Sequence, residues 1–165
     1  TAALVLGDAL AVSLLDLRGF SPEDFAVSHP AGRLGRRLLV QVRDVMHGGE
    51  SLPKVLSGVS LKEALLEMSA KGLGMTAIVG QNDGLLGLFT DGDLRRALDK
   101  NIDLLSARVD DVMTRKPKTI CDELLAADAV QILEQNRING LLVVDAKGVL
   151  VGALNMHDLM RAGVV

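Results

Sequence analysis

Two short runs of this sequence have the residue types of a ribose and phosphate site. Thr90 stands three residues before Asp93, and Asn155 stands three residues before Asp158. A carboxylate accepts hydrogen bonds from hydroxyl groups, and the N-terminus of a helix presents N–H groups to an anion. The same residue pairs also cap helices well without any ligand. Residue type alone therefore leaves two readings open at both places, a ligand site or ordinary capping.

Both runs belong to an internal repeat. The Asp-Val-Met of residues 44–46 returns at 111–113, and the run at 87–93 returns at 152–158. Self-similarity at a fixed period indicates one supersecondary unit that was duplicated and whose copies pack on each other. A cleft between two like units is a natural place for a small ligand.

Each copy must position its carboxylate with the order helix, strand, strand, helix. In the first copy, Ser60 and Glu63 form the S-x-x-E pattern of a capping box before an amphipathic helix. The spacing then predicts strands at 75–79 and 85–89 and a helix from Thr90 to about residue 98. In the second copy it predicts a helix at 124–136, strands at 141–145 and 149–154, and a last helix capped by Asn155. Residues 47–53 and 114–118 are expected to be loops.

Composition excludes several classes of partner. The net charge of −3 disfavours nucleic acid, and the absence of Trp and Tyr removes the usual platforms for stacking bases. No apolar run reaches the length of about 18 residues that a membrane span needs. The single cysteine, Cys121, is compatible with a reducing compartment, and no His/Cys spacing supports a metal site. We therefore expect a cytoplasmic protein without a nucleic-acid, membrane or metal partner.

The repeat resembles a tandem CBS-domain pair, the nucleotide-sensing arrangement also called a Bateman module. The likeness covers residues 43–163, and it is carried by the two Asp-Val-Met runs, by Val143-Val144-Asp145 and by the run from Gly87 to Asp93. The resemblance implies an α/β fold with CBS units at 43–105 and 106–165, related by a pseudo-twofold axis.

The resemblance also implies which residues bind a ligand. In CBS units this Asp binds ribose hydroxyls, this Thr lies near phosphate, and the cleft is completed by the other repeat. The residues implied for the first cleft are Thr90, Asp93, Thr114, Lys118, Ile138 and Asn139. Those implied for the second cleft are Asn155, His157 and Asp158, with His47, Leu73 and Gly74 on the opposite wall.

The second cleft departs from the first in having histidines. A protonated imidazole beside an anionic group strengthens binding as the pH falls. From His47 and His157 we expect a ligand with an extra acidic group to prefer the Asp158 cleft. A simple nucleotide is expected to prefer the Asp93 cleft.

Residues 1–42 resemble the end of a sugar-isomerase (SIS) domain with its linker. The supporting runs are Gly7 to Val12, Arg18 to Phe20 and Ser28 to Gly35. Followed by a CBS pair, they are similar to the bacterial arabinose 5-phosphate isomerases, which interconvert ribulose 5-phosphate and arabinose 5-phosphate for Kdo and lipopolysaccharide synthesis. The resemblance implies an acid–base role for His29 in a full-length enzyme. The other catalytic groups would lie upstream of Thr1, so we expect a piece of a longer protein that is inactive by itself.

Two functions follow as hypotheses. In the first, the pair is a regulatory module that binds AMP, ATP or the nucleotide-sugar CMP-Kdo and biases its own SIS domain, with no required cofactor. In the second, the pair is purely structural and assembles isomerase subunits without a ligand. In either case we expect a homodimer or tetramer, because helices of both copies present apolar faces that one pair cannot cover.

Overall fold

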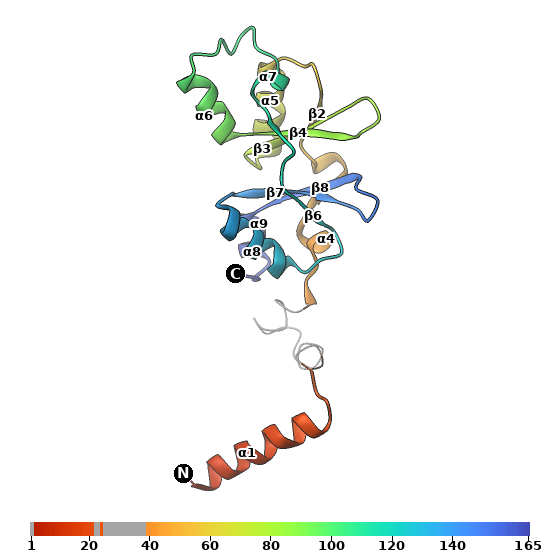
Figure 1. Cartoon of the computed structure of the whole chain (residues 1–165), viewed down its shortest axis with the longest axis vertical. Helices are drawn as coiled ribbons and strands as arrows, with labels where there is room; N and C mark the ends of the chain where they lie inside the picture. Colours follow the sequence, from red (N-terminus) through yellow and green to blue (C-terminus); the bar gives the residue numbers. More distant parts are fainter. Residues whose placement is uncertain (1, 22–23, 25–38) are drawn as a thin grey trace.

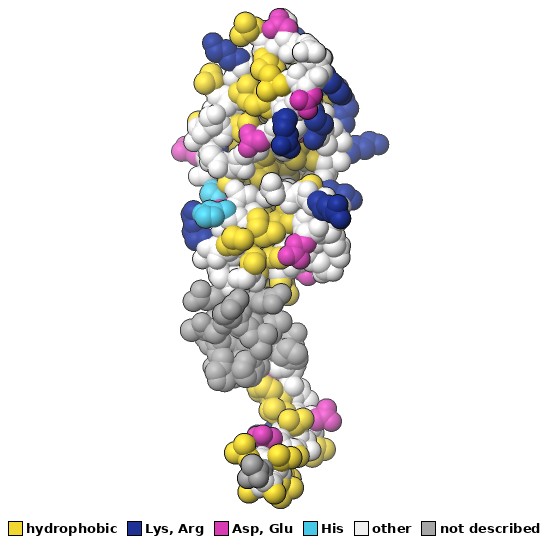
Figure 2. Space-filling model, turned by 90° about the vertical axis from the view of Figure 1, so that its left-hand side faces the viewer, with side chains coloured by type: hydrophobic (Ala, Val, Ile, Leu, Met, Phe, Trp, Pro, Cys, Tyr) yellow, Lys and Arg dark blue, Asp and Glu magenta, His cyan; other side chains and the backbone are white. Residues whose placement is uncertain are grey.

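The computed structural model describes residues 2–21, 24 and 39–165. The first element is helix α1 (Ala2–Leu17), which is followed by Gly19 with a φ of +61°, a left-handed conformation that favours glycine. Apolar side chains cover the exposed surface of α1 (Figure 2), among them Leu4, Leu10 and Leu17. Within the described residues, no helix combines the length and the apolar character that a membrane crossing requires.

The repeats build two four-stranded sheets that lie one above the other (Figure 1). Their orders are β2-β3-β4-β5 and β1-β8-β7-β6. The strands are β1 (His47–Gly48), β2 (Lys54–Leu56), β3 (Met75–Val79), β4 (Leu85–Thr90), β5 (Thr114–Arg115), β6 (Thr119–Cys121), β7 (Gly140–Val144) and β8 (Leu150–Asn155). Edge strands β2 and β6 run parallel to their neighbours, whereas the other pairs are antiparallel.

Helices cover the outer face of each sheet (Figure 1). The longer ones are α5 (Leu61–Lys71) and α6 (Asp91–Asp99) on the first sheet, and α8 (Ala126–Asn136) and α9 (Met156–Arg161) on the second. The short ones are α4 (Val42–Val45), α7 (Val109–Val112) and the 3-10 turn η1 (Gly49–Ser51). Strand alternation divides the core accordingly, because side chains of one strand point to opposite faces. Ile78 packs under the helices, whereas Met75 and Ala77 pack between the sheets against Leu142 and Ala153.

The opening segment of each repeat packs on the other repeat. β1 pairs with β8, with His47 opposite Ala153, and β5 pairs with β4, with Thr114 opposite Leu88. Both segments were expected to be loops. Two-residue strands are invisible in a sequence pattern, and here each one exists because it adds to a sheet that the other repeat supplies.

Glycines in the repeated motifs leave the space that this strand pairing between the repeats requires. A Cβ placed at Gly87 would lie 2.5 Å from Met113 Sδ, and one at Gly152 would lie 2.5 Å from Met46 Sδ. The two motifs that reveal the repeat are therefore packing partners across the boundary between the copies.

The structure confirms the expected α/β fold and the order helix, strand, strand, helix in each copy. β3 has the predicted bounds, and Ser60 caps α5 as expected. Helix α8 begins at Ala126, two residues later than predicted, because Leu125 has an extended backbone and serves as its N-cap.

Candidate ligand-binding site

Asp93 lies at the start of α6 and receives four hydrogen bonds. Its Oδ2 accepts from the backbone N and the Oγ1 of Thr90 at 2.9 and 2.6 Å. Its Oδ1 accepts from Arg96 Nη2 at 2.5 Å and from Thr114 Oγ1 at 2.9 Å. The side chain is only 4% exposed. Capping of α6 places Thr90 locally, whereas Thr114 arrives from β5, so this carboxylate joins the two repeats.

Asp158 occupies the corresponding position at the start of α9 and is 9% exposed. Its Oδ2 accepts from the Asn155 backbone N at 2.9 Å, and the Asp158 N donates to Asn155 Oδ1 at 3.1 Å. Its Oδ1 lies 2.9 Å from Nε2 of His47, which comes from β1 in the other repeat. The two clusters therefore share one plan, with His47 in the place of Thr114.

A cavity of about 270 Å³ adjoins Asp93 between α6 and α7. It is lined by Asp93, Arg96, Ala97, Lys100, Ile102, Asp111, Val112, Met113 and Thr114. The side chain of Arg96 remains 60% exposed although its guanidinium is paired with Asp93. The lining of the cavity therefore combines acidic, cationic, hydroxyl and apolar side chains.

The predicted residues Asn139 and Gly74 contact the helix starts of their own repeats. Asn139 O accepts from Met156 N at 3.1 Å, and Gly74 O accepts from Asp91 N at 3.3 Å. A Cβ placed at Gly74 would lie 2.9 Å from Asp91 Oδ2, so no larger residue fits there without displacing that carboxylate. Within the described residues, no hydrogen bond joins either residue to the carboxylate of the other repeat.

The remaining predicted residues either form no hydrogen bond to the two carboxylates within the described part of the chain or lie outside that part. Lys118 and His157 are exposed, Ile138 packs at the edge of the second helical core, and Leu73 is buried between the sheets. His29 lies outside the described residues. Their predicted binding roles therefore stay predictions.

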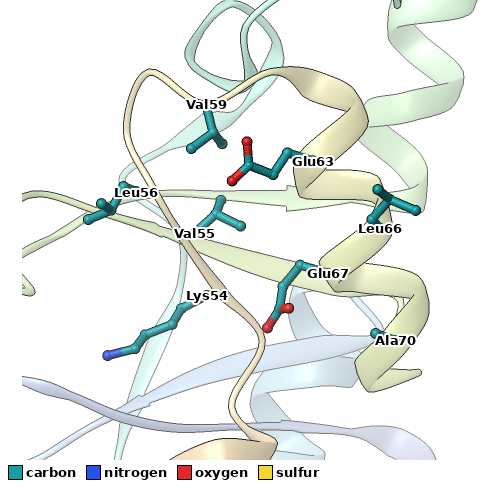
Figure 3. Close-up of a pocket in the computed structure, with 8 residues that line it drawn as sticks. All are labelled: Lys54, Val55, Leu56, Val59, Glu63, Leu66, Glu67 and Ala70. Atoms are coloured by element: carbon teal, nitrogen blue, oxygen red, sulfur yellow. The ribbon is translucent and has the colours of Figure 1, made fainter.

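A second hollow was not expected from the sequence. A groove of about 500 Å³ lies between β2 and α5, lined by Lys54, Val55, Leu56, Val59, Glu63, Leu66, Glu67 and Ala70. Figure 3 shows the carboxylates of Glu63 and Glu67 directed from α5 towards β2. The i, i+4 spacing of Glu63 and Glu67 indicates that both acids lie on one face of a helix. Strand β2 was not predicted, because an edge strand of three residues has too little alternation to detect.

One further carboxylate ties α7 to the turn after β2. Asp110 accepts hydrogen bonds from Ser57 Oγ at 2.5 Å and from the Gly58 N at 2.6 Å. Burial raises the pKa of Asp110, but these hydrogen bonds and the nearby Arg115 lower it by a larger amount. The net shift of the pKa is therefore downward. This contact stabilises the fold away from both clusters.

Comparisons with known proteins agree with this fold. A family model described as the CBS domain matches residues 42–100 and 109–165. A solved structure of CBSX2 in complex with AMP superposes with a TM-score of 0.64 at 29% identity, covering 76% of this chain and 96% of that one. A CBS domain protein from Pyrobaculum aerophilum complexed with AMP has a TM-score of 0.66 at 18% identity, covering 73% of this chain and 90% of that one, which supports the fold alone.

Curated relatives match the chain over its entire length. The arabinose 5-phosphate isomerase KdsD of Pseudomonas aeruginosa is 61% identical over 165 residues, which make up 51% of that protein. The KdsD of Escherichia coli K12 is 49% identical over 165 residues, which make up 50% of that protein. The chain thus spans about half the length of the curated relatives it matches.

Proposed function

The chain belongs to the CBS domain family, and from this premise we propose that it is a regulatory module that binds a nucleotide or a nucleotide-sugar. The observation that carries the proposal is a buried carboxylate at the start of α9, joined to the other repeat by His47. A buried carboxylate that keeps free acceptor positions is suited to a vicinal diol such as that of ribose. The AMP complex of CBSX2, at 29% identity, supports the same ligand class.

We further propose that the module serves an arabinose 5-phosphate isomerase. The support is the identity of 49–61% to KdsD proteins along the whole chain, including residues 1–42. In that parent enzyme, a ligand of the CBS pair alters catalysis only if it binds one state of the enzyme better than another. His29 would act there as an acid–base group on the sugar phosphate.

Helix α1 supports the assignment of residues 1–42 to the adjoining catalytic domain. Its side chains are exposed on all sides, and apart from Asp8, Ser13 and Asp16 they are apolar or glycine. A helix that is apolar all round is normally buried in a protein core. We propose that this core is formed with the part of the parent enzyme that the chain does not span.

A second candidate function is favoured by one observation. The acceptor positions of Asp93 are already occupied by protein donors, as they would be in a module that only holds the two repeats together. In that case the CBS pair would be structural and would bind no ligand.

Calorimetric titration of this chain with AMP, ATP and CMP-Kdo separates the two functions. The regulatory proposal expects saturable heat from at least one of these ligands, and loss of that heat on Asp158→Ala. The matched control is Asp99→Ala, a change on α6 away from both carboxylate clusters. If none of the three ligands binds, the structural function is the one supported.

A further inference from the structure

We infer that the groove between β2 and α5 is a docking site for an extended basic segment of another protein, which adds as a strand beside β2. The inference concerns the outer side of the first sheet and does not depend on a nucleotide ligand. It is carried by a free strand edge, by an apolar wall beside that edge, and by two carboxylates that have no partner in the described part of the chain.

The first step is the exposed edge of the sheet. The carbonyl of Pro53 and the N–H of Ser57 form hydrogen bonds to β3, at 2.9 and 2.8 Å. Because alternate residues of a strand direct their backbone groups to opposite sides, those of Lys54 and Leu56 face away from β3. Within the described residues, no other strand pairs with this side of β2. An extended peptide can add to such an edge through main-chain hydrogen bonds.

The second step is the wall that α5 places beside this edge. The residues of α5 that line the groove have the spacing of one helix face, and they are Glu63, Leu66, Glu67 and Ala70. Leu66 is 62% exposed, and Leu56 on β2 is 52% exposed. Aliphatic side chains of an added strand therefore find apolar neighbours on both sides of the groove.

The third step is the charge of the groove. Within the described part of the chain, the carboxylates of Glu63 and Glu67 form neither an ion pair nor a hydrogen bond. Among the described residues that line the groove, Lys54 alone is basic. Its ammonium lies 3.0 Å from Asp83 Oδ1 and points away from α5 (Figure 3). The groove therefore keeps two negative charges that a basic partner can neutralise.

The spacing of the two acids fits an extended partner. Glu63 and Glu67 are four residues apart on α5, which corresponds to a rise of about 6 Å. Side chains on the same face of a strand lie about 6.6 Å apart. Two basic residues at positions i and i+2 of an added strand can therefore each face one carboxylate. The residue between them then faces the other side of the sheet.

The second repeat provides an internal comparison. α8 has the same length as α5, and its third and seventh residues are Asp128 and Ile132, where α5 has Glu63 and Glu67. Asp128 Oδ2 accepts a hydrogen bond from the backbone N of Leu125 at 3.2 Å and so helps to cap α8. Both repeats thus have an edge strand beside this helix, but the pair of unpartnered acids belongs to the first repeat.

The partner is a polypeptide other than this chain. None of the described strands carries basic residues at alternate positions, so a second copy has no strand of the required chemistry among them. Two copies joined through this groove would also bring their acids together. The groove is suited to a segment in which Lys or Arg alternates with aliphatic residues.

The test uses a fluorescent peptide of about eight residues in which lysine alternates with valine, titrated with this chain and followed by anisotropy. We expect saturable binding that weakens about fivefold or more in E63Q/E67Q, because two ion pairs are lost. The matched control is E123Q/E134Q, which makes the same change of charge on exposed residues of the second repeat and should leave the affinity unchanged. A peptide with glutamate in place of lysine should not bind.

Amide hydrogen exchange, measured by NMR, locates the peptide on the chain. The backbone N–H groups of Lys54 and Leu56 should exchange about tenfold more slowly or less when the peptide is bound, because they then donate to its carbonyl groups. A peptide with a central proline should bind more weakly, since proline lacks a backbone N–H.

Three outcomes would overturn the inference: no saturable binding of the lysine–valine peptide, equal affinity in E63Q/E67Q, or binding that leaves the N–H groups of Lys54 and Leu56 unprotected. Protection of these N–H groups without peptide, lost on dilution, would also overturn it, by showing that a second copy occupies the edge. Binding to this chain but not to the full-length parent enzyme would overturn it as well, by showing that the rest of the parent covers the groove.

Discussion

At the scale of single residues, Thr76 has a buried side-chain hydroxyl. Its Oγ1 has no hydrogen-bond partner within the described part of the chain. Leaving such a group unsatisfied costs about 1–3 kcal/mol, and an apolar group of the same shape avoids that cost. We expect Thr76→Val to raise the free energy of unfolding by about 1 kcal/mol, measured by urea denaturation. Thr90→Val, which removes a hydrogen bond to Asp93 and a helix cap, should lower it by about 1–2 kcal/mol. Equal losses in both variants would contradict this account of Thr76.

The carboxylate of Asp110 makes the free energy of unfolding depend on pH. Its pKa is lowered in the folded state, because the hydrogen bonds from Ser57 and Gly58 outweigh the effect of burial. A carboxylate with a depressed pKa stabilises the fold above its unfolded pKa of about 3.9, and the contribution is lost as the pH falls through the folded pKa.

Asp110→Asn should therefore lower the free energy of unfolding at pH 7 by about 1 kcal/mol or less, since the site is partly exposed to solvent. The difference from the wild-type chain should shrink as the pH is lowered from about 4 towards 2. Urea denaturation across this pH range measures it, with Asp99→Asn as the control. A difference that stays constant with pH would show that the Asp110 charge is not involved.

Residue-level prediction succeeded where the interaction is local. The spacing of Thr90 and Asp93 was enough to identify a capping pair, since both partners lie in one turn of chain. It could not show that Arg96 fills an acceptor position that its counterpart Arg161 leaves empty. That difference depends on side-chain placement in three dimensions and has no pattern in the sequence.

At the scale of elements, the contact between β4 and the segment from α7 to β5 depends on Gly87. Gly87→Ala places a Cβ 2.5 Å from Met113 Sδ and 3.1 Å from the carbonyl oxygen of Thr114. Overpacking of this kind typically costs about 1–3 kcal/mol, so thermal and urea denaturation should show a loss in that range. Met113→Ala in the same chain should recover part of the loss. The matched control is Gly84→Ala, which meets no atom within 4 Å; an equal loss there would contradict the steric explanation.

Elements with enough length were predictable, and short ones were not. β3 and α5 have clear alternation or amphipathic spacing with capping signals, and they appear where the sequence placed them. β1 and β5 have two residues each and exist only through pairing with the other repeat. Their formation is a tertiary effect, which single-sequence periodicity does not contain.

At the scale of the whole molecule, the outer helices leave apolar side chains uncovered. Leu66 on α5, Leu98 on α6 and Met160 on α9 are exposed. We expect a homodimer or a higher even assembly that buries such residues, measured by light scattering at micromolar concentrations. The double variant L66D/L98D should dissociate it, whereas Leu105→Asp, an exposed residue outside the helices, should not. A wild-type chain that stays monomeric would refute this expectation.

Catalysis is predicted to require the part of the parent enzyme that this chain does not span. The purified chain should not convert arabinose 5-phosphate to ribulose 5-phosphate. In the full-length enzyme, His29→Ala should lower kcat by about 100-fold or more, the usual effect of losing an acid–base group. The control is His157→Ala in the CBS pair, which should leave kcat without effector unchanged. A near-normal kcat in His29→Ala would exclude a catalytic role.

The repeat predicted part of the whole-molecule arrangement, but not all of it. The returning motifs at 44–46 and 111–113 predicted two similar units in contact, and the sheets do face each other. The groove beside β2 was missed, because it is formed by an edge strand that has no clear pattern.

The central claim is that one ribonucleotide binds with its ribose on Asp158, and a crystal structure of the chain grown with AMP tests it most directly. The account predicts AMP with its 2′- and 3′-hydroxyls donating to the two carboxylate oxygens of Asp158. Electron density for the ribose on Asp93, or for AMP in the groove between β2 and α5, would contradict it.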